Sequence, residues 1–177
     1  MKALFLDRDG IINIDSGYVS DKKSFIFKQD IFNLLNRAIE KNYIIIIVTN
    51  QSGIGRGYFS ENDFNKLNEW MLYEFKKKNI LISKTYFCPH HPTEGLHSYN
   101  IKCNFRKPNP GMFLKAKKEF NINMNKSIML GDKVSDMNAA ISSGIVKNFL
   151  LCDNETQNKK NKSFNVIANI LDIYEIL

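Results

Sequence analysis

One stretch of the sequence, YIIIIVTN at residues 43–50, restricts the possible fold more than any other. Its apolar residues follow one another without polar alternation, and most of them are β-branched. A strand with one wet face alternates apolar and polar residues, whereas a strand of a parallel sheet covered on both faces does not. The stretch therefore predicts a buried strand in a parallel sheet.

Similar short apolar runs alternate along the chain with segments whose apolar residues recur at helix spacing, as in residues 30–42. Asp30 is expected to cap this helix, Ser60 opens another with Asp63 at its capping-box position, and Gly144 ends a third. We expect strands over residues 3–7, 43–50, 84–89, 127–132 and 147–152, and helices over residues 30–42, 60–79, 110–121, 135–144 and 163–177.

The alternation of strands and helices predicts a doubly wound, mostly parallel α/β sheet of Rossmann-like type. A chain of 177 residues has the size of one domain, so residues 1–177 are expected to form a single domain with short insertions and no large cap. Residues 88–109 lack periodicity and are expected to form an ordered insertion, and residues 153–162 a mobile surface loop.

The formal net charge of +7 is compatible with a nucleic acid or with an anionic small molecule as partner. The densest basic runs, residues 76–78 and 159–160, contain no aromatic residues, which is typical of solvated faces. We therefore expect no nucleic-acid partner. No apolar run approaches the roughly 20 residues of a membrane span, and the first residues carry no secretory signal. With only three cysteines, no disulfide framework is expected, so the sequence predicts a soluble, cytoplasmic protein without a membrane partner.

Polar residues stand where the predicted strands end. Asp7 ends the first strand, Thr49 and Asn50 end the second, and Asp132 ends the fourth. Ligands of such sheets bind beyond the carboxyl ends of the strands, so these side chains are expected to share one rim. Lys107, from the insertion, is expected to join them there.

This set of residues suits phosphoryl transfer. Asp7 and Asp132 can hold Mg²⁺, which favours a few carboxylates, water and a phosphate. The metal lets an anionic nucleophile approach an anionic phosphate, and Asp7 can then attack phosphorus. Asp9 can protonate the leaving alcohol and later deprotonate water. Thr49 and Lys107 can neutralise the charge of the phosphoryl oxygens.

Each of these residues alone has an ordinary structural explanation, because strand-end aspartates and short polar pairs often serve as caps and turns. The order Asp, Thr, Lys, Asp around one rim is what favours a phosphoryl-transfer site. Arg8, between two aspartates, is expected to face the other way, since alternate residues of an extended segment do so. Gly10 allows a tight backbone beside a phosphate.

The motif order resembles the haloacid dehalogenase superfamily of phosphatases, whose four motifs are similar to DRDG, VTN, RKPNPG and GDKVSDM in this chain. With DSGYV and CPHHP added, residues 4–151 resemble the D-glycero-D-manno-heptose 1,7-bisphosphate phosphatases and their sister histidinol phosphatases. The resemblance implies that Asp7 is the nucleophile, that Asp9 is the acid/base and binds Mg²⁺ through its backbone carbonyl, and that Asp132 completes the Mg²⁺ ligands. It implies that Thr49 and Lys107 stabilise the phosphoryl group. The substrate-binding residues that it implies are Asp15, Ser16, Gly17, Tyr18, Asn50, Gln51, Ser52, Arg106 and Lys133.

Asp136 has two explanations at this stage. It can orient Lys107 or metal-bound water, or it can simply place a negative charge at a helix N-terminus.

The resemblance implies a Mg²⁺-dependent phosphatase that removes the 7-phosphate of the heptose bisphosphate through an aspartyl-phosphate. The reaction would serve the synthesis of nucleotide-activated heptose for surface polysaccharide, including lipopolysaccharide. Arg106 and Lys133 suit a second, non-reacting phosphate, whereas the amine of histidinol phosphate would favour an acidic pocket. Histidinol phosphate or a nucleotide remains an alternative substrate. A non-enzymatic receiver domain, which also uses Mg²⁺, Asp, Thr and Lys, is an alternative of another class. Family members of this size are usually monomers, so a monomer is expected.

A zinc site is incomplete in this chain. Cys88, His90 and Cys103 match three of the four zinc ligands of the resembling family, but Phe105 stands at the fourth position. Structural zinc prefers four ligands, so water, His91 or His97 could complete the set. Alternatively, the loop folds without metal, and Phe105 is then expected to be largely buried.

Overall fold

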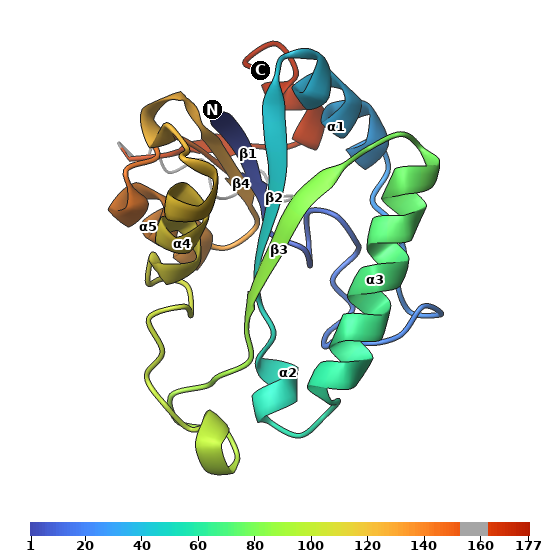
Figure 1. Cartoon of the computed structure of the whole chain (residues 1–177), viewed down its shortest axis with the longest axis vertical. Coiled ribbons are helices and arrows are strands. Elements are labelled where there is room, and N and C mark those ends of the chain that lie inside the picture. The colour runs from blue at the N-terminus through green and yellow to red at the C-terminus, as the bar shows by residue number, and fades with distance from the viewer. Residues whose placement is uncertain (153–162) are drawn as a thin grey trace.

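The structure is a computed structural model that describes residues 1–152 and 163–177 of the chain. Its centre is one sheet of six strands in the order β3-β2-β1-β4-β5-β6, and all neighbours pair in parallel (Figure 1). The strands are β1 (Lys2–Leu6), β2 (Tyr43–Asn50), β3 (Ile82–Cys88), β4 (Ile128–Gly131), β5 (Lys147–Leu151) and β6 (Asn165–Ile167). This arrangement confirms the predicted doubly wound sheet, and no large cap lies among the described residues.

Helices cover both faces of the sheet, with α1 and α3 on one side and α4 and α5 on the other (Figure 1). Their bounds, with those of the short 3-10 helices, are α1 (Ile31–Glu40), α2 (Ser52–Gly55), α3 (Glu61–Lys77), η1 (His97–Tyr99), α4 (Gly111–Phe120), η2 (Met124–Lys126), α5 (Val134–Ser143) and η4 (Ile170–Ile173). The five predicted strands and the first four predicted helices are confirmed, with ends within two residues of the predicted ones.

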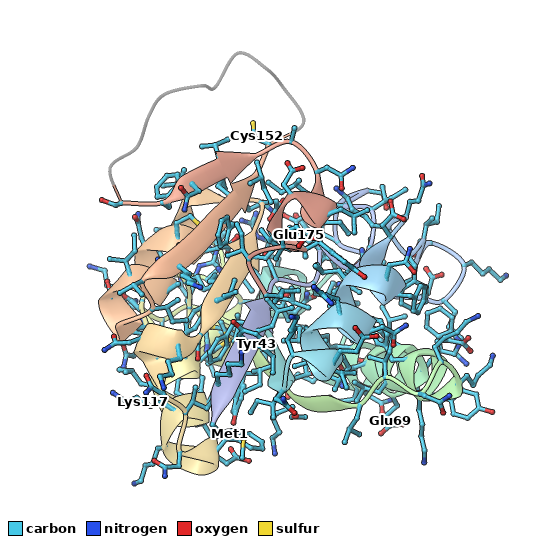
Figure 2. All side chains as sticks on the ribbon, turned by 90° about the horizontal axis from the view of Figure 1, so that it is seen from above. Met1, Tyr43, Glu69, Lys117, Cys152 and Glu175 are labelled. Carbon is cyan, nitrogen blue, oxygen red and sulfur yellow. The ribbon has the colours of Figure 1, made fainter. Side chains whose placement is uncertain are left out.

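The core has two layers because the strands bury both faces. In β1, Leu4 faces one layer and Phe5 the other, and both side chains are fully buried. The layer that contains Leu4 includes side chains of α1 and α3, whereas the layer that contains Phe5 includes side chains of α4 and α5. In the view from above, the labelled Glu69 of α3 and Lys117 of α4 lie on opposite sides of β1, which follows the labelled Met1 (Figure 2). The unalternating apolar run of β2 is thus explained by burial on both faces.

Two of the three predicted helix signals are confirmed. Ser60 Oγ accepts the Asp63 N–H at 3.1 Å, and Asp63 Oδ2 accepts the Ser60 N–H at 3.0 Å. Gly144 ends α5 with φ of 95°, where glycine avoids the strain of a side chain. The predicted cap at Asp30 is wrong: its backbone is left-handed at φ 69°, and its carboxylate accepts from the Asn33 side chain at 3.3 Å and from no backbone N–H of the helix.

The predicted closing helix over residues 163–177 is wrong. Strand β6 pairs with the edge of β5, with Leu150 opposite Val166, and only the four residues of η4 follow as a 3-10 helix. The β-branched residues of β6 suit a strand, and pairing with β5 gains ladder hydrogen bonds that helix periodicity does not reveal. Ile170 and Ile173, three residues apart, are both buried, as the 3-10 spacing allows. The predicted loop over residues 153–162 lies outside the described residues.

The insertion after β3 is ordered, as predicted. It packs against α2, because the Gly55 N–H donates to the Pro89 carbonyl at 3.1 Å and the Leu96 N–H donates to the Gly55 carbonyl at 2.7 Å. This places the insertion at the carboxyl ends of β2 and β3, at the lower end of Figure 1. No helix within the described part of the chain is long and apolar enough to cross a membrane.

Candidate active site

A cavity of about 560 Å³ opens at the carboxyl ends of the central strands. Most residues singled out from the sequence line it, namely Asp7, Asp9, Asp15, Gly17, Tyr18, Asn50, Gln51, Ser52, Arg106, Lys107, Lys133 and Asp136. Thr49 and Ser16 do not line it, and Asp132 lines a smaller adjoining cavity of about 200 Å³. His91, Pro92, Gly53, Pro108 and Ser135 complete the lining. The site thus lies where the parallel sheet predicts it.

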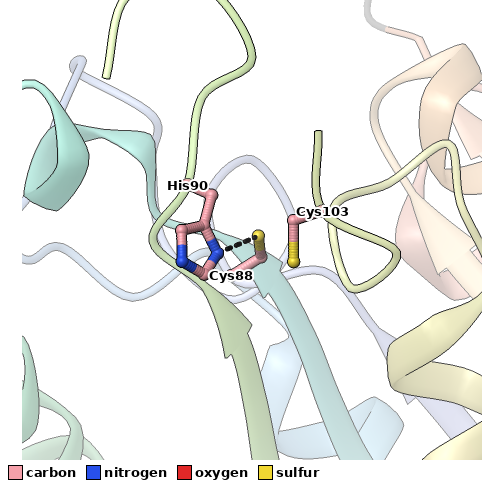
Figure 3. A group of neighbouring side chains, drawn as sticks. All are labelled: Cys88, His90 and Cys103. Atoms are coloured by element: carbon pink, nitrogen blue, oxygen red, sulfur yellow. Dashed lines mark hydrogen bonds between the residues drawn. The ribbon is translucent and has the colours of Figure 1, made fainter. Parts of the chain in front are cut away.

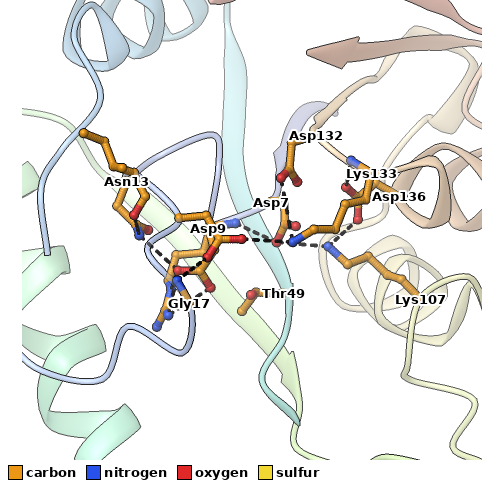
Figure 4. A network of polar contacts seen from close by, with 12 residues as sticks. Asp7, Asp9, Asn13, Gly17, Thr49, Lys107, Asp132, Lys133 and Asp136 are labelled. Atoms are coloured by element: carbon orange, nitrogen blue, oxygen red, sulfur yellow. Dashed lines mark hydrogen bonds and ion pairs between the residues drawn. The ribbon is translucent and has the colours of Figure 1, made fainter. Parts of the chain in front are cut away.

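Lys107 stands between two buried carboxylates. Its Nζ lies 3.0 Å from Asp7 Oδ1 and 2.7 Å from Asp136 Oδ1, and it donates to the Val48 carbonyl at 2.8 Å (Figure 4). Burial alone would lower the pKa of Lys107, but Asp136 and Asp7 outweigh burial and raise it. The site therefore holds a fixed ammonium ion.

Asp136 has both of the functions that the sequence left open. Its Oδ1 pairs with Lys107, whereas its Oδ2 accepts the backbone N–H of Lys133 at the start of α5, at 3.0 Å. The Asp136 side chain thus places a negative charge at the N-terminus of α5 and also pairs with Lys107.

The backbone of Lys107 is held by the end of β2. The Asn50 side chain donates to the Lys107 carbonyl at 3.0 Å and accepts the Lys107 N–H at 3.1 Å. These reciprocal bonds fix the insertion against the sheet, so that strand β2 positions a lysine that is distant in sequence.

Asp7 is a buried carboxylate close to three other carboxylates. Burial raises its pKa to about 7, against the lowering effect of Lys107, and Asp136, Asp132 and Asp9 add repulsion. Its Oδ1 accepts the Arg8 N–H at 2.7 Å in addition to the Lys107 ion pair, whereas Oδ2 accepts no hydrogen bond from the described residues. A cation bound to this carboxylate would relieve this repulsion.

Asp132 offers a second oxygen for such a cation. Its Oδ1 is buried and accepts no hydrogen bond within residues 1–152 and 163–177, and burial raises its pKa to about 6. Single oxygens of Asp7, Asp132 and Asp136 lie within 4.8 Å of one another. Gly10 makes room for this group, because its φ is 87° and a Cβ there would collide with the Asp132 carboxylate. The donor set of buried carboxylate oxygens fits Mg²⁺.

Asp9 is held by different partners. It accepts hydrogen bonds from the Arg8 guanidinium at 2.9 Å, from Asn13 Nδ2 at 3.0 Å and from Gln51 Nε2 at 2.9 Å. Gln51 Nε2 also donates to Thr49 Oγ1 at 2.9 Å, so this amide joins the two residues.

The prediction that Arg8 faces away from the aspartates is wrong. Its side chain is 1% exposed and reaches back to Asp9 and to the Val19 carbonyl, the latter at 2.8 Å. Alternation applies only while the strand continues, and here the chain turns at once, with the Ile12 N–H donating to the Arg8 carbonyl at 2.8 Å. A tight backbone at Gly10 was predicted from the sequence, but it was not predicted that the resulting turn brings Arg8 back to Asp9.

The loop over residues 15–18 forms another wall. Asp15 accepts the Gly17 N–H at 3.0 Å and pairs with Lys133 Nζ at 3.1 Å. Burial would raise the pKa of Asp15, but these two partners lower it. Gly17 and Tyr18 have φ of 84° and 51°, and the second value is unusual for a residue with a side chain. The Lys133 bridge ties this loop to the start of α5.

The insertion supplies Arg106 and His91. Arg106 donates to the His90 carbonyl at 3.0 Å, and His91 Nδ1 accepts the Glu94 N–H at 3.0 Å. Burial, Arg106 and Arg56 lower the pKa of His91. His91 stands in the CPHHP motif, but the sequence suggested for it only a possible place among the zinc ligands.

Cys88, His90 and Cys103 also meet in the insertion. Single ligand atoms of the three residues lie within 4.8 Å of one another, and Cys88 Sγ lies 3.7 Å from His90 Nδ1 (Figure 3). The metal-free alternative predicted a largely buried Phe105, but this side chain is only partly buried, beside the core layer of α4 and α5. Burial raises the pKa of the Cys88 thiol to about 12.

Comparison with known proteins agrees with this geometry. A family model described as polynucleotide kinase 3 phosphatase matches residues 4–168. D-glycero-alpha-D-manno-heptose-1,7-bisphosphate 7-phosphatase of Burkholderia mallei is 43% identical over 176 residues, which are 99% of this chain and 93% of that protein. D-glycero-beta-D-manno-heptose-1,7-bisphosphate 7-phosphatase of Vibrio cholerae is 46% identical over 143 residues, which are 81% of this chain and 77% of that protein.

Solved structures show the same fold. The crystal structure of D,D-heptose 1,7-bisphosphate phosphatase from B. bronchiseptica, complexed with magnesium and phosphate, superposes with a TM-score of 0.85 and 25% identity. The match covers 99% of this chain and 97% of that one. By sequence and by fold, the chain belongs to the haloacid dehalogenase-like phosphatases and, among them, to the family of the D-glycero-D-manno-heptose 1,7-bisphosphate 7-phosphatases.

Proposed function

We propose that this protein is a Mg²⁺-dependent phosphatase that removes the 7-phosphate of D-glycero-D-manno-heptose 1,7-bisphosphate. The observation that carries the proposal is the Asp7–Lys107–Asp136 group at the cavity, in a chain 43–46% identical to phosphatases named for this substrate. A nucleophilic carboxylate next to a fixed ammonium ion suits attack on a phosphate.

In the proposed reaction, Asp7 Oδ2 attacks phosphorus and forms an aspartyl-phosphate. Oδ1 is engaged by Lys107 and by the Arg8 N–H, so Oδ2 is the oxygen that remains for the attack. Asp7, Asp132 and the backbone carbonyl of Asp9 would hold Mg²⁺, which would offset the charge of the nucleophile and of the phosphate. Lys107 adds a positive charge beside the phosphoryl oxygens.

Asp9 is the proposed acid and base. It gives a proton to the leaving sugar oxygen and takes one from the water that hydrolyses the aspartyl-phosphate. Its bonds to Arg8, Asn13 and Gln51 hold the carboxylate at the cavity wall. Thr49 accepts the Gln51 amide, which leaves its own hydroxyl proton for a phosphoryl oxygen.

The proposed substrate has a second phosphate that does not react. Arg106 and Lys133 both line the cavity, and cationic groups of this kind suit a bisphosphate better than the ammonium group of histidinol phosphate. Asp15, Ser16, Gly17, Tyr18, Asn50, Gln51 and Ser52 are proposed to bind the sugar. The receiver-domain alternative is wrong, because the chain belongs to a phosphatase family.

We also propose that Cys88, His90 and Cys103 hold one Zn²⁺ with an open fourth position. Neighbouring ligand atoms around tetrahedral zinc are about 3.6 Å apart, which fits the 3.7 Å between Cys88 Sγ and His90 Nδ1. His91 cannot complete the set from Nδ1, because that atom accepts the Glu94 N–H. Zinc here would fix the insertion that leads to Arg106 and Lys107.

The cellular setting is part of the proposal. Residues 1–177 would act as one domain and as a cytoplasmic monomer, in the synthesis of nucleotide-activated heptose for surface polysaccharide such as lipopolysaccharide. The names of the relatives support the sugar, and the single six-stranded sheet supports one domain. Size-exclusion chromatography with light scattering tests the monomer.

The experiment that tests the function compares phosphate release from D-glycero-D-manno-heptose 1,7-bisphosphate and from histidinol phosphate, with Mg²⁺ and with a chelator. We expect kcat/KM for the bisphosphate to exceed that for histidinol phosphate at least about 100-fold, since the second phosphate and an ammonium group have opposite charges. Equal values, or turnover that survives the chelator, would contradict the proposal.

A further inference from the structure

His91 is fixed in the cavity wall by backbone hydrogen bonds. Its Nδ1 accepts the Glu94 N–H at 3.0 Å and faces the Thr93 N–H at 3.4 Å, and its own backbone N–H donates to the Tyr99 carbonyl at 3.0 Å. His91 also lines the cavity. The imidazole is therefore oriented before any ligand binds.

This orientation determines which ring nitrogen is a donor. Because Nδ1 receives an N–H, its lone pair is in use and the ring hydrogen must be on Nε2. Nε2 has no hydrogen-bond partner among the described residues. His91, a residue of the cavity lining, thus carries its ring hydrogen on Nε2, with the tautomer set by the Glu94 backbone.

Arg106 lies beside this donor. It is anchored to the carbonyl of His90, the residue before His91, so both groups are held by one short piece of the insertion. Both line the cavity that also contains Asp7 and Lys107. The nearby carboxylate of Glu94 is paired with Arg56. A guanidinium and an N–H donor held together in this way suit an anion such as a phosphate.

We propose that His91 is a specificity-determining residue, whose Nε2–H donates to the phosphate of the substrate that is not hydrolysed, beside Arg106. The inference rests on the proposed function, since it requires a bisphosphate as substrate. It explains why a histidine stands at this position of the cavity wall, where an Asp or Asn side chain could also accept the backbone N–H but would place no N–H at the position of Nε2.

The test uses two substrates that differ only in this phosphate, D-glycero-D-manno-heptose 1,7-bisphosphate and the corresponding heptose 7-phosphate. His91→Asn keeps an oxygen at the place of Nδ1 for the Glu94 N–H but removes the Nε2 donor. His91→Gln restores an amide N–H near the place of Nε2. His97→Asn, an exposed histidine of the same insertion outside the cavity lining, is the matched control.

The measured quantity is the ratio of kcat/KM for the bisphosphate to kcat/KM for the monophosphate. We expect His91→Asn to lower this ratio about 10- to 100-fold, mainly through KM, because a hydrogen bond to a charged group is lost. His91→Gln should recover the ratio to within about threefold of the wild type, and His97→Asn should leave the ratio unchanged.

Other results overturn the inference. If His91→Asn slows both substrates equally, the histidine has only a structural function, and if the ratio stays the same, it does not contact the second phosphate. If His91→Asn fails to fold, the test depends on His91→Gln, for which the inference requires a ratio close to that of the wild type. A ratio in His91→Gln as low as that in Arg106→Ala would then contradict the inference. Failure of the proposed function is a separate result, because the wild type itself would then not hydrolyse the bisphosphate.

Discussion

The Nζ atom of Lys107 lies 3.0 Å from Oδ1 of Asp7, and both side chains are almost completely buried. A carboxylate and an ammonium from distant parts of the sequence thus meet at the end of the central strand. The group of three is not neutral, because Asp136 shares the same Nζ at 2.7 Å. One ammonium ion therefore pairs with two carboxylates, and one negative charge stays uncompensated beside Asp7. This charge favours the binding of a divalent metal ion.

The first prediction concerns Asp136. Asp136→Asn keeps an acceptor for the Lys133 N–H but removes the charge that holds Lys107, so Lys107 should be less well placed beside the phosphoryl group. We expect kcat to fall about 10- to 100-fold, and the free energy of unfolding to fall by about 3 kcal/mol because a buried ion pair is broken. Asp30→Asn is the control, since its left-handed backbone tolerates asparagine. Steady-state kinetics and thermal melting measure both effects, and an unchanged kcat would show that Asp136 only caps α5.

The second prediction concerns Arg8. Arg8→Lys keeps the positive charge but cannot form the forked hydrogen bonds that hold both oxygens of Asp9. We expect kcat to fall about tenfold while KM stays within about twofold, because Asp9 is proposed to act in the chemical steps and not in binding. A rise in KM with unchanged kcat would contradict a positioning function for Arg8.

The third prediction concerns pH and Mg²⁺. Burial raises the pKa of Asp7 from 3.8 to about 7 and that of Asp132 from 3.8 to about 6 in the metal-free protein. The folded protein thus keeps protons that the unfolded chain has already released, and the stability that they contribute below pH 3.8 is lost as the pH rises to about 7. Asp15, with its lowered pKa, contributes in the opposite sense, but its contribution is complete above its unfolded-state pKa of 3.8.

Mg²⁺ competes with the protons of Asp7 and Asp132. We therefore expect saturating Mg²⁺ to raise Tm more at pH 8 than at pH 5, by several degrees, and Asp132→Asn to remove most of this difference. Differential scanning fluorimetry with and without Mg²⁺ measures it. An equal rise in Tm at the two pH values would mean that the ion binds elsewhere.

The fourth prediction concerns zinc. Phe105→Cys should supply the fourth ligand and raise zinc affinity at least about tenfold, whereas Cys103→Ser should abolish stoichiometric binding. Cys152→Ser is the control, because Cys152 is not part of the ligand group. Elemental analysis and competition with a chromogenic chelator give stoichiometry and affinity. Wild-type protein purified without zinc that also fails to bind added zinc would contradict the three-ligand site.

The rim of the sheet could be predicted because it follows from strand ends. An unalternating apolar run predicts a strand in a covered parallel sheet, and the residues at its carboxyl end are then at the ligand-binding edge. Asp7 and Asp132 directly follow their strands, and Thr49 lies at the end of β2. The position of Lys107 at this rim was predicted from the order of motifs and from the resemblance. The insertion that contains Lys107 has no periodicity from which its position could be predicted.

The features that sequence reasoning missed depend on contacts made after the chain turns. Arg8 reaches Asp9 only because the backbone folds back at Gly10, and alternation along a strand does not describe that turn. The C-terminal segment has helix-like apolar spacing, but β5 offers an open edge, so that Val166 and its neighbours form β6. His91 is at the cavity because the insertion packs on α2, and the sequence contains no periodic signal for that packing.

The central claim is that Asp7 is transiently phosphorylated. The most direct measurement is rapid acid quenching during the first turnover of heptose 1,7-bisphosphate with Mg²⁺, followed by borohydride reduction and peptide mass spectrometry. Borohydride converts an aspartyl-phosphate to homoserine, so we predict homoserine at position 7 and nowhere else, formed and lost at rates compatible with kcat, and none in Asp7→Asn. Phosphate release at the normal rate with an unmodified Asp7, or turnover that persists in Asp7→Asn, would contradict the account.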